Sequence, residues 1–321
     1  MDLTYILAAF GGGILGAAIG GMNAFILCGL SCIVGTALSV ATGNSTFNQV
    51  VTWGPFLAPH IAFAGGAAAS AYAARREKLS CGRDVLSALY GLESPEVLLA
   101  GGIFGVFGCL VKVLLDLIPK LEGLPWTNTM ALTVGISGLL ARLVFGKTGL
   151  FGCCGKETGR WNRKKDQPWQ PWPSSPWLVV TVALGVSLVS FFTSHSLPGS
   201  VGLVFGISAV SLILFHGDAH LPIFLHTALC AEFAVFLTDD LGWGIFFGLA
   251  AAFFAELFAG IFLNCGDTHI DPPALAISAV FCLFPFFLIL GVMSHTGLFS
   301  LVLAFLLAVS GTGLLFFLRR T

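Results

Sequence analysis

Three titratable side chains lie within five residues of one another in a turn that joins two long apolar segments. They are Asp267, His269 and Asp271, and two prolines follow them directly. Carboxylate and imidazole groups at the end of an apolar segment can bind an ion or a polar solute, relay a proton or hold a divalent metal. A second Gly-Asp-x-His run places Asp218 and His220 at another such break. Because the pattern occurs twice, we expect a solute or ion site, with Asp271 equally suited to cap the next helix.

Two further carboxylates and one lysine lie inside long apolar segments. A bare carboxylate at the bilayer centre costs about 2.5 to 3.5 kcal/mol on insertion scales, so such groups usually face the protein interior. Glu232 and Glu256 could therefore bind a cation or relay a proton, or stay neutral and hydrogen-bonded. Lys112 lies four residues before Asp116, which favours an ion pair on one helix face; contact with Glu256 or with an anion is the alternative. His60, on an apolar helix, is expected to be a packing residue or a ligand.

The composition places the chain in a membrane. Of its 321 residues, 56% are hydrophobic and only 10% are charged, which is too much apolar surface for a water-soluble globule. The 40 glycines favour helices that pack closely through small residues over a β-barrel. A net charge of -1 makes nucleic acid an unexpected partner. Most of the nine cysteines lie in apolar segments, where cysteine acts as a small hydrophobe, so we expect no disulfide framework and no cofactor.

Apolar segments separated by glycine, proline and charged residues predict eleven membrane-spanning helices. Their approximate bounds are 4–21, 24–41, 56–74, 96–118, 130–146, 177–193, 200–215, 221–237, 241–264, 274–292 and 297–318. The interval 43–55 is expected to be an external loop, with a re-entrant half-helix as the alternative. In the first helix, Gly12, Gly16 and Gly20 form a groove along one face that would admit another helix.

Two stretches of the chain match without a gap when the sequence is shifted by 143 positions. Phe104, Gly105, Leu114, Gly123, Ala131 and Leu132 then coincide with Phe247, Gly248, Leu257, Gly266, Ala274 and Leu275. In this frame the turn with Trp126 and Asn128 corresponds to the turn with His269 and Asp271. The sequence therefore predicts four regions. These are a first five-helix membrane unit (1–148), a basic Pro- and Trp-rich linker (149–176), a second five-helix unit (177–293) and an additional C-terminal helix (294–321).

Basic residues determine the expected orientation, because short loops rich in Lys and Arg stay in the cytoplasm. The connections at 75–95 and 147–176 and the C-terminus carry four, six and two of them, which is 12 of the 15 in the chain. Eleven helices put all three inside and the N-terminus outside, so the two units would be inverted relative to one another. We expect a bacterial cytoplasmic membrane, and glycine-rich helices that could join copies of the chain into a homo-oligomer.

Segments of the second unit resemble the HPP transmembrane family, which is named for a His-Pro-Pro signature. The chain reads Gly-Ile-Ser-Ala-Val-Ser-Leu from Gly206, Gly-Asp-Ala-His-Leu-Pro from Gly217 and His-Ile-Asp-Pro-Pro-Ala from His269, in the family's order. Ile270 and Asp271 separate the histidine from the prolines, which departs from the family's pattern. The resemblance implies a permease for a small anion such as nitrite, whereas the carboxylate of Asp271 opposes a negatively charged substrate.

The sequence therefore predicts a membrane transport protein, either a secondary transporter or a channel, for a small polar solute or ion. Its path is expected between the inner turn 269–271 and the outer turn 126–128, with Glu232 and Glu256 coupling transport to protons or cations. One alternative is an integral-membrane enzyme that uses the Asp-His-Asp turn as a metal or acid-base centre on a lipid-borne substrate. Another is a scaffold that transports nothing. We expect no enzyme, and because no nucleotide-binding loop occurs, no ATP-driven transport.

Overall fold

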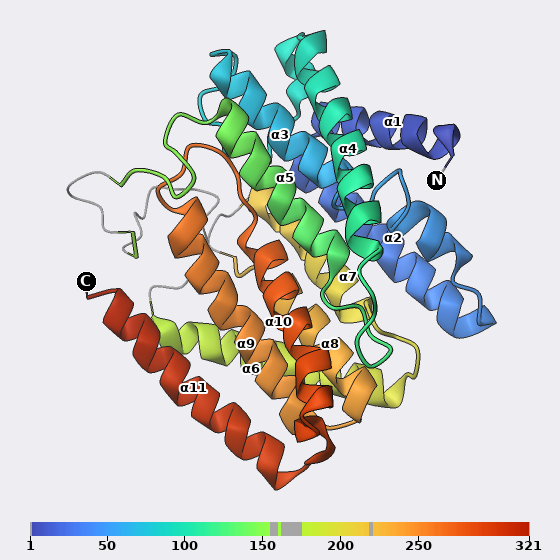
Figure 1. Ribbon diagram of the computed structural model, residues 1–321, viewed down its shortest axis with the longest axis vertical. Coiled ribbons are helices and arrows are strands. Elements are labelled where there is room, and N and C mark those ends of the chain that lie inside the picture. The colour runs from blue at the N-terminus through green and yellow to red at the C-terminus, as the bar shows by residue number, and fades with distance from the viewer. Residues whose placement is uncertain (1, 155–159, 162–174, 218–220, 321) are drawn as a thin grey trace.

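The computed structural model describes residues 2–154, 160–161, 175–217 and 221–320, and in these residues it is built from helices (Figure 1). The α-helices are α1 (Leu3–Ile19), α2 (Gly21–Thr42), α3 (Ala62–Arg75), α4 (Pro95–Asp116), α5 (Thr129–Phe145), α6 (Pro176–Ser196), α7 (Leu203–Ser211), α8 (Leu225–Thr238), α9 (Leu241–Phe258), α10 (Pro272–Ile289) and α11 (Leu298–Leu318). A π-helical turn, Ala259–Leu263, continues α9, and a 3-10 turn, Leu212–His216, continues α7. Each of the predicted helical segments overlaps one of these helices, with bounds that differ by up to six residues.

Local sequence explains where several helices begin. The side chains of Asp2, Asn128, Asp240 and Asp271 each accept a hydrogen bond from the backbone N–H three residues later. Such N-caps satisfy a donor that the helix itself leaves without a partner. Prolines occupy the first turn of α4, α6 and α10, where their missing N–H is not needed. The third helix starts at Ala62 instead of residue 56, because the prolines at 55 and 59 keep that stretch in turns.

The helices are those of a membrane protein. Among the described residues, six are long and apolar enough to cross a bilayer: Gly21–Thr42, Pro95–Asp116, Pro176–Ser196, Leu241–Leu263, Pro272–Ile289 and Leu298–Leu318. Four apolar helices are shorter: Leu3–Ile19, Thr129–Phe145, Leu203–His216 and Leu225–Thr238. Large apolar side chains such as Leu3, Phe192 and Leu298 are exposed on the outer surface, as expected for side chains that contact lipid.

Both halves of the chain make the same set of helix contacts. In the first half α3 packs on α1, α2, α4 and α5, and α4 also packs on α1 and α5. In the second half α8 packs on α6, α7, α9 and α10, and α9 also packs on α6 and α10. Helices α1 to α5 therefore correspond to α6 to α10. Helix α11 has no counterpart, and it lies along α9 and α6 at the edge of the molecule (Figure 1).

The halves meet through two pairs of corresponding helices, α2 with α7 and α5 with α10. Where α2 crosses α7, a Cβ added to Gly29 would lie 3.0 Å from the carbonyl oxygen of Gly206 and 3.1 Å from the nitrogen of Val210. A Cβ added to Gly206 would lie 3.0 Å from the carbonyl oxygen of Gly29 and 3.3 Å from the nitrogen of Ile33. Both glycines begin a Gly-x-Ser run, so each helix uses the same positions to approach the other.

Helices α5 and α10 lie side by side and run in opposite directions (Figure 1). Thr127, just before α5, donates a 2.7 Å hydrogen bond to the carbonyl of Ser278, in the second turn of α10. Gly138, in the third turn of α5, lies against Ile270, just before α10. The start of each helix therefore lies beside the interior of the other.

The connections between helices contact one another in two groups. In one, Met22 N–H donates to the carbonyl of Val85 (2.8 Å), Asn23 and His216 share a hydrogen bond (2.8 Å), and Gly82 pairs with Thr268. In the other, Asp240 accepts from Gly297 and Ser300, the Trp243 indole donates to His295, and His195 contacts Asp239. Connections that alternate along the chain thus gather at two ends of the molecule.

The structure tests two expectations about the first half, the glycine groove on α1 and the external loop at 43–55. The groove on α1 is confirmed at Gly12 and Gly16, because a Cβ on Gly16 would lie 2.0 Å from the carbonyl of Ala62 at the start of α3. The interval 43–55 is not a plain external loop. It contains a π-helical turn, Asn48–Thr52, that packs on α2, and it leads Trp53 to the space between the halves.

Candidate functional site

A cavity of about 360 Å³ lies where the two halves meet. Side chains of α2, α3, α5, α7, α8 and α10 surround it together with Trp53. Among its described lining residues, Asn128 has the only amide side chain and Asp271 has the only carboxylate. Four pairs that correspond in the 143-residue frame all line it: Asn128 and Asp271, Met130 and Pro273, Ala131 and Ala274, Val134 and Ile277. The cavity therefore lies between equivalent positions of the two halves.

The two polar residues are the N-caps of α5 and α10. Asn128 Oδ1 accepts from the N–H of Ala131 (3.0 Å), and Asp271 Oδ2 accepts from the N–H of Ala274 (2.8 Å). Asp271 Oδ1 also lies 3.2 Å from Nε2 of His269, whose side chain is buried. The Asp271 side chain remains 20% exposed, so its carboxylate is open to the cavity. The same structural position thus carries a neutral amide in one half and a carboxylate in the other.

Aromatic rings form a continuous wall on one side of the cavity. The ring of Trp53 lies 6.0 Å from that of Phe205, Phe205 lies 6.0 Å from Phe25, and Phe25 lies 5.7 Å from Phe63. Phe63 in turn meets the imidazole of His269 edge to face at 5.6 Å. Sequence reasoning missed these four residues, which we call the aromatic wall, because apolar rings in apolar segments look like ordinary packing.

The predicted site residues are only partly brought together. Asn128 and Asp271 line the cavity, and His269 holds Asp271. Trp126 instead donates its indole N–H to the carbonyl of Leu115 (3.3 Å) and is not among the lining residues. Asp218 and His220 lie outside the described residues. Within the part of the chain that the structure describes, no three His, Cys, Asp or Glu side chains are grouped to hold a metal.

Asp267 holds the turn before α10 to the end of α5. Its carboxylate accepts from the backbone N–H of Lys147 and from the hydroxyl of Thr148, the latter at 2.8 Å. Arg142 of α5, almost fully buried, reaches the same turn and donates to Oγ1 of Thr268 (2.9 Å) and to the carbonyl of Thr268. Gly266 leaves room for this guanidinium, because a Cβ there would lie 2.1 Å from it.

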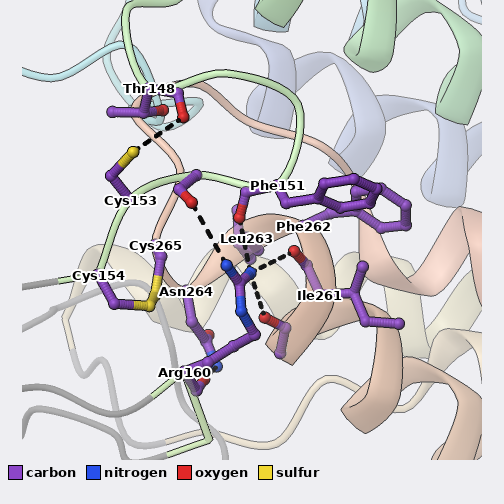
Figure 2. The surroundings of a disulfide bond; sticks show 12 residues. Thr148, Phe151, Cys153, Cys154, Arg160, Ile261, Phe262, Leu263, Asn264 and Cys265 are labelled. Atoms are coloured by element: carbon purple, nitrogen blue, oxygen red, sulfur yellow. Dashed lines mark hydrogen bonds between the residues drawn. A yellow bond between two sulfur atoms is a disulfide. The ribbon is translucent and has the colours of Figure 1, made fainter.

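Three arginines donate to five successive carbonyls, residues 260–264, at the end of α9 and its π-helical turn. Arg160 donates to the first two (3.2 and 2.7 Å), Arg142 to the third, and Arg83 to the last two (both 3.4 Å); Figure 2 shows the contacts of Arg160. The last carbonyls of a helix have no partner within it and carry partial negative charge. We call Arg83, Arg142 and Arg160 the arginine cluster. It fixes the chain immediately before the Asp-His-Asp turn.

A disulfide joins the linker to this same region. Cys154 pairs with Cys265, with 4.9 Å between their Cα atoms (Figure 2). The sequence predicts no disulfide framework, and in the described part of the chain the structure contains this single bond, with the other seven cysteines outside any disulfide. The two residues are 111 positions apart, and the sequence does not reveal that the linker folds back against the end of α9.

Glu232 does not line the cavity, and its carboxylate accepts hydrogen bonds from the first backbone N–H groups of α7. Its fully buried carboxylate accepts from the N–H groups of Gly202 (3.3 Å), Val204 (2.9 Å) and Phe205 (3.2 Å). These groups lie at the start of α7, where a helix has unpaired donors and a positive dipole end. The buried glutamate therefore explains how α7 can begin inside the protein.

We expect Glu232→Ala to lower the free energy of unfolding by roughly 2 to 4 kcal/mol, because it leaves several buried N–H groups without an acceptor. Glu232→Gln keeps one acceptor oxygen and should lose about half as much. Thermal unfolding of the purified protein in detergent measures both. If Glu232→Gln, which keeps the side-chain volume, loses nothing while Glu232→Ala does, side-chain volume matters here and hydrogen bonding to the second oxygen does not.

Of the remaining predicted residues, Lys112 and Glu256 form ion pairs with nearby side chains. Lys112 forms the expected ion pair with Asp116, at 2.6 Å. Glu256 pairs with Arg319 at the end of α11 (3.1 Å), which ties the additional helix to the second half. His60 lies in the turns before α3, where it is buried, and it does not line the cavity.

Comparison with known proteins agrees with the internal repeat. A family model described as a family of unknown function (DUF7973) matches the chain twice, at residues 1–161 and at residues 152–302. No curated protein matches the chain, and no solved structure does. The two matches divide the chain where the helix contacts divide it, so the protein contains two copies of one unit.

Proposed function

Because the chain belongs to the DUF7973 family and contains its unit twice, we propose that the cavity between the two copies is the binding site of a membrane transport protein. The protein would be a secondary transporter or a channel for a small polar solute. The observation that carries this proposal is the position of the cavity, which is lined by equivalent residues of both halves. Transporters built from repeats bind their solute at such an interface.

The proposal includes eleven membrane crossings and inverted halves. The two groups of helix connections support eleven crossings, since alternate connections of a chain that crosses repeatedly lie on opposite sides. The opposite directions of α5 and α10, which occupy the same place in their halves, support the inversion. Two copies inserted in opposite orientations can exchange conformations, which alternating access requires.

Helices α5 and α10 would both begin within the bilayer. Thr127 lies beside Ser278, which is about seven residues into α10, so the two helix starts are offset by roughly 10 Å along the axis. Helices α3, α5 and α8 have 14, 17 and 14 residues, fewer than the ~20 needed to cross the hydrocarbon core. Interrupted helices at the midplane are a common setting for solute sites in transporters.

The geometry favours a different solute and coupling site from those that the sequence suggested. A nitrite-like anion, which the HPP resemblance implies, would meet the carboxylate of Asp271. Glu232 and Glu256 are held by the start of α7 and by Arg319, so proton or cation coupling belongs more naturally to Asp271 with His269.

We place the arginine cluster and the C-terminus in the cytoplasm of a bacterial cell and the N-terminus outside, following the distribution of basic residues. Disulfides are typical of oxidising compartments, and cytosolic ones are usually transient or redox-sensing. In this orientation the thiol reductants of the cytoplasm would supply the two electrons and two protons that convert the Cys154–Cys265 disulfide to two thiols.

Flux into proteoliposomes tests the proposal. The probes are methylammonium, nitrite, urea and protons, so that cation, anion, neutral and proton permeation are each measured. We expect at least one probe to enter faster than into protein-free vesicles, and Ala131→Trp, which fills the cavity, to abolish that flux. Ala8→Trp, on the exposed surface of α1, should leave it unchanged. The proposal fails if Ala131→Trp and wild type move every probe equally.

A further inference from the structure

We propose that the cavity binds a small organic cation, a protonated or quaternary amine with an apolar body. Its charge would lie at Asp271 and its body against the aromatic wall. The inference rests on the proposed function, since it names the class of solute for the same cavity.

The charge of the cavity comes from one residue. Asp271 is the only charged side chain among the described residues that line it. Its two oxygens contact Ala274 N–H and His269, one partner each. A carboxylate oxygen has two lone pairs, so both oxygens can still accept a hydrogen bond from a ligand or attract its charge. Since the side chain is partly exposed, a ligand in the cavity can reach it.

The start of α10 does not offset this charge with donors of its own. Helix N-termini often bind anions through free N–H groups. Here the first two helical positions are Pro272 and Pro273, which have no N–H, and the N–H of Ala274 is already bonded to Asp271. Within the described residues, the first turn of α10 therefore offers a ligand the carboxylate of Asp271 and no free backbone N–H that could bind an anion.

The rest of the lining selects against a bare metal ion. Hard cations such as Ca²⁺ need six to eight oxygen ligands, and among the described lining residues only Asn128 and Asp271 have side-chain oxygens. Tryptophan and phenylalanine rings attract cations through their faces and also pack against hydrocarbon. A volume of about 360 Å³ has room for a small organic molecule. An amine attached to an apolar group satisfies the carboxylate and the aromatic wall together.

The two halves supply their own matched variants. Asp271→Asn gives the second half the residue that the first half has at this position, and Asn128→Asp does the reverse. Asparagine and aspartate are both good N-caps, so each variant changes charge while the start of the helix keeps its cap. Differences in ligand binding between these variants then report the charge.

Binding is measured by isothermal titration of the full chain in a neutral detergent. Three probes of similar size are used: benzyltrimethylammonium, N-benzylacetamide and phenylacetate. We expect benzyltrimethylammonium to bind most tightly, Asp271→Asn to weaken it at least about tenfold, which is ~1.4 kcal/mol, and Asn128→Asp to strengthen it. The affinity of N-benzylacetamide should change little in Asp271→Asn. The affinity of phenylacetate, the anion, should change little or increase.

The inference is overturned if phenylacetate binds wild type more tightly than the cation, or if Asp271→Asn binds the cation as tightly as wild type. Should Asp271→Asn fail to fold, an unchanged or weaker cation affinity in Asn128→Asp also overturns it. The flux assay separates the two proposals. If the cation binds but no probe crosses the membrane, the cation site is supported and the transport function is wrong. If other probes cross but the cation does not bind, the transport function is supported and the cation site is wrong.

Discussion

Replacement of Arg142 by leucine is expected to destabilise the protein more than any other single change considered. Arg142 is almost fully buried, and its guanidinium donates to Thr268 and to the carbonyls of Leu150 (3.2 Å) and Phe262. Each buried acceptor left without a partner costs about 1 to 3 kcal/mol, so a total loss of roughly 3 to 5 kcal/mol follows. For a chain of 321 residues that lowers the thermal midpoint by about 4 to 8 °C.

Differential scanning fluorimetry in detergent measures the midpoint. Arg320→Leu is the matched control, because it makes the same chemical change at an exposed position near the C-terminus. Arg142→Lys should give an intermediate loss, since an ammonium group cannot reach all the acceptors of a guanidinium. A midpoint for Arg142→Leu equal to that of the control would contradict the role of the arginine cluster.

The second large effect is expected at the contact between α2 and α7. In Gly29→Ala the new Cβ would lie 2.5 Å from the Cβ of Ala209, which is too close for two carbon atoms. The halves must then separate slightly, and we expect a loss of about 2 to 3 kcal/mol from overpacking. Adding Ala209→Gly removes the opposing Cβ and should restore part of the stability, since the closer of the contacts is relieved while those with the backbone of Gly206 and Val210 remain. The pair is therefore a double-mutant test.

Gly185→Ala in α6 serves as the control, because no atom lies within 4 Å of the added Cβ. It should be neutral or slightly stabilising, since alanine is the better helix former. The same fluorimetric assay applies to wild type, Gly29→Ala, Ala209→Gly, the double variant and the control. If Ala209→Gly fails to rescue Gly29→Ala, the close approach of the two helices at this point is wrong.

Much of the fold follows from the sequence because membrane helices and repeats leave strong local signals. Apolar runs located the eleven helical segments, and the ungapped frame linked α4 and α5 to α9 and α10. That frame could not extend to the earlier helices, because α2 has 22 residues and α7 only nine. Their correspondence emerges from the matching helix contacts of the two halves and from the reciprocal contact of Gly29 and Gly206.

The site was predictable where it depends on polar residues and obscure where it depends on packing. Asn128, His269 and Asp271 stand out because polar groups are rare in apolar surroundings. Trp53 and the phenylalanines do not, since nothing local distinguishes a ring that faces a cavity from one in the core. Glu232 shows the converse difficulty, because a buried carboxylate can serve a ligand or a helix start, and only its three N–H partners decide.

The Cys154–Cys265 bond turns the linear chain into a covalent ring with two tails. The ring contains α6 to α9, one tail contains the first five helices, and the other contains α10 and α11. Only residues 266–271 separate the closed ring from α10. Residues 146–153 likewise separate the ring from α5. While the bond is intact, α5 and α10 are therefore each joined to the same covalent ring by a segment of fewer than ten residues, and these two segments lie on either side of the disulfide.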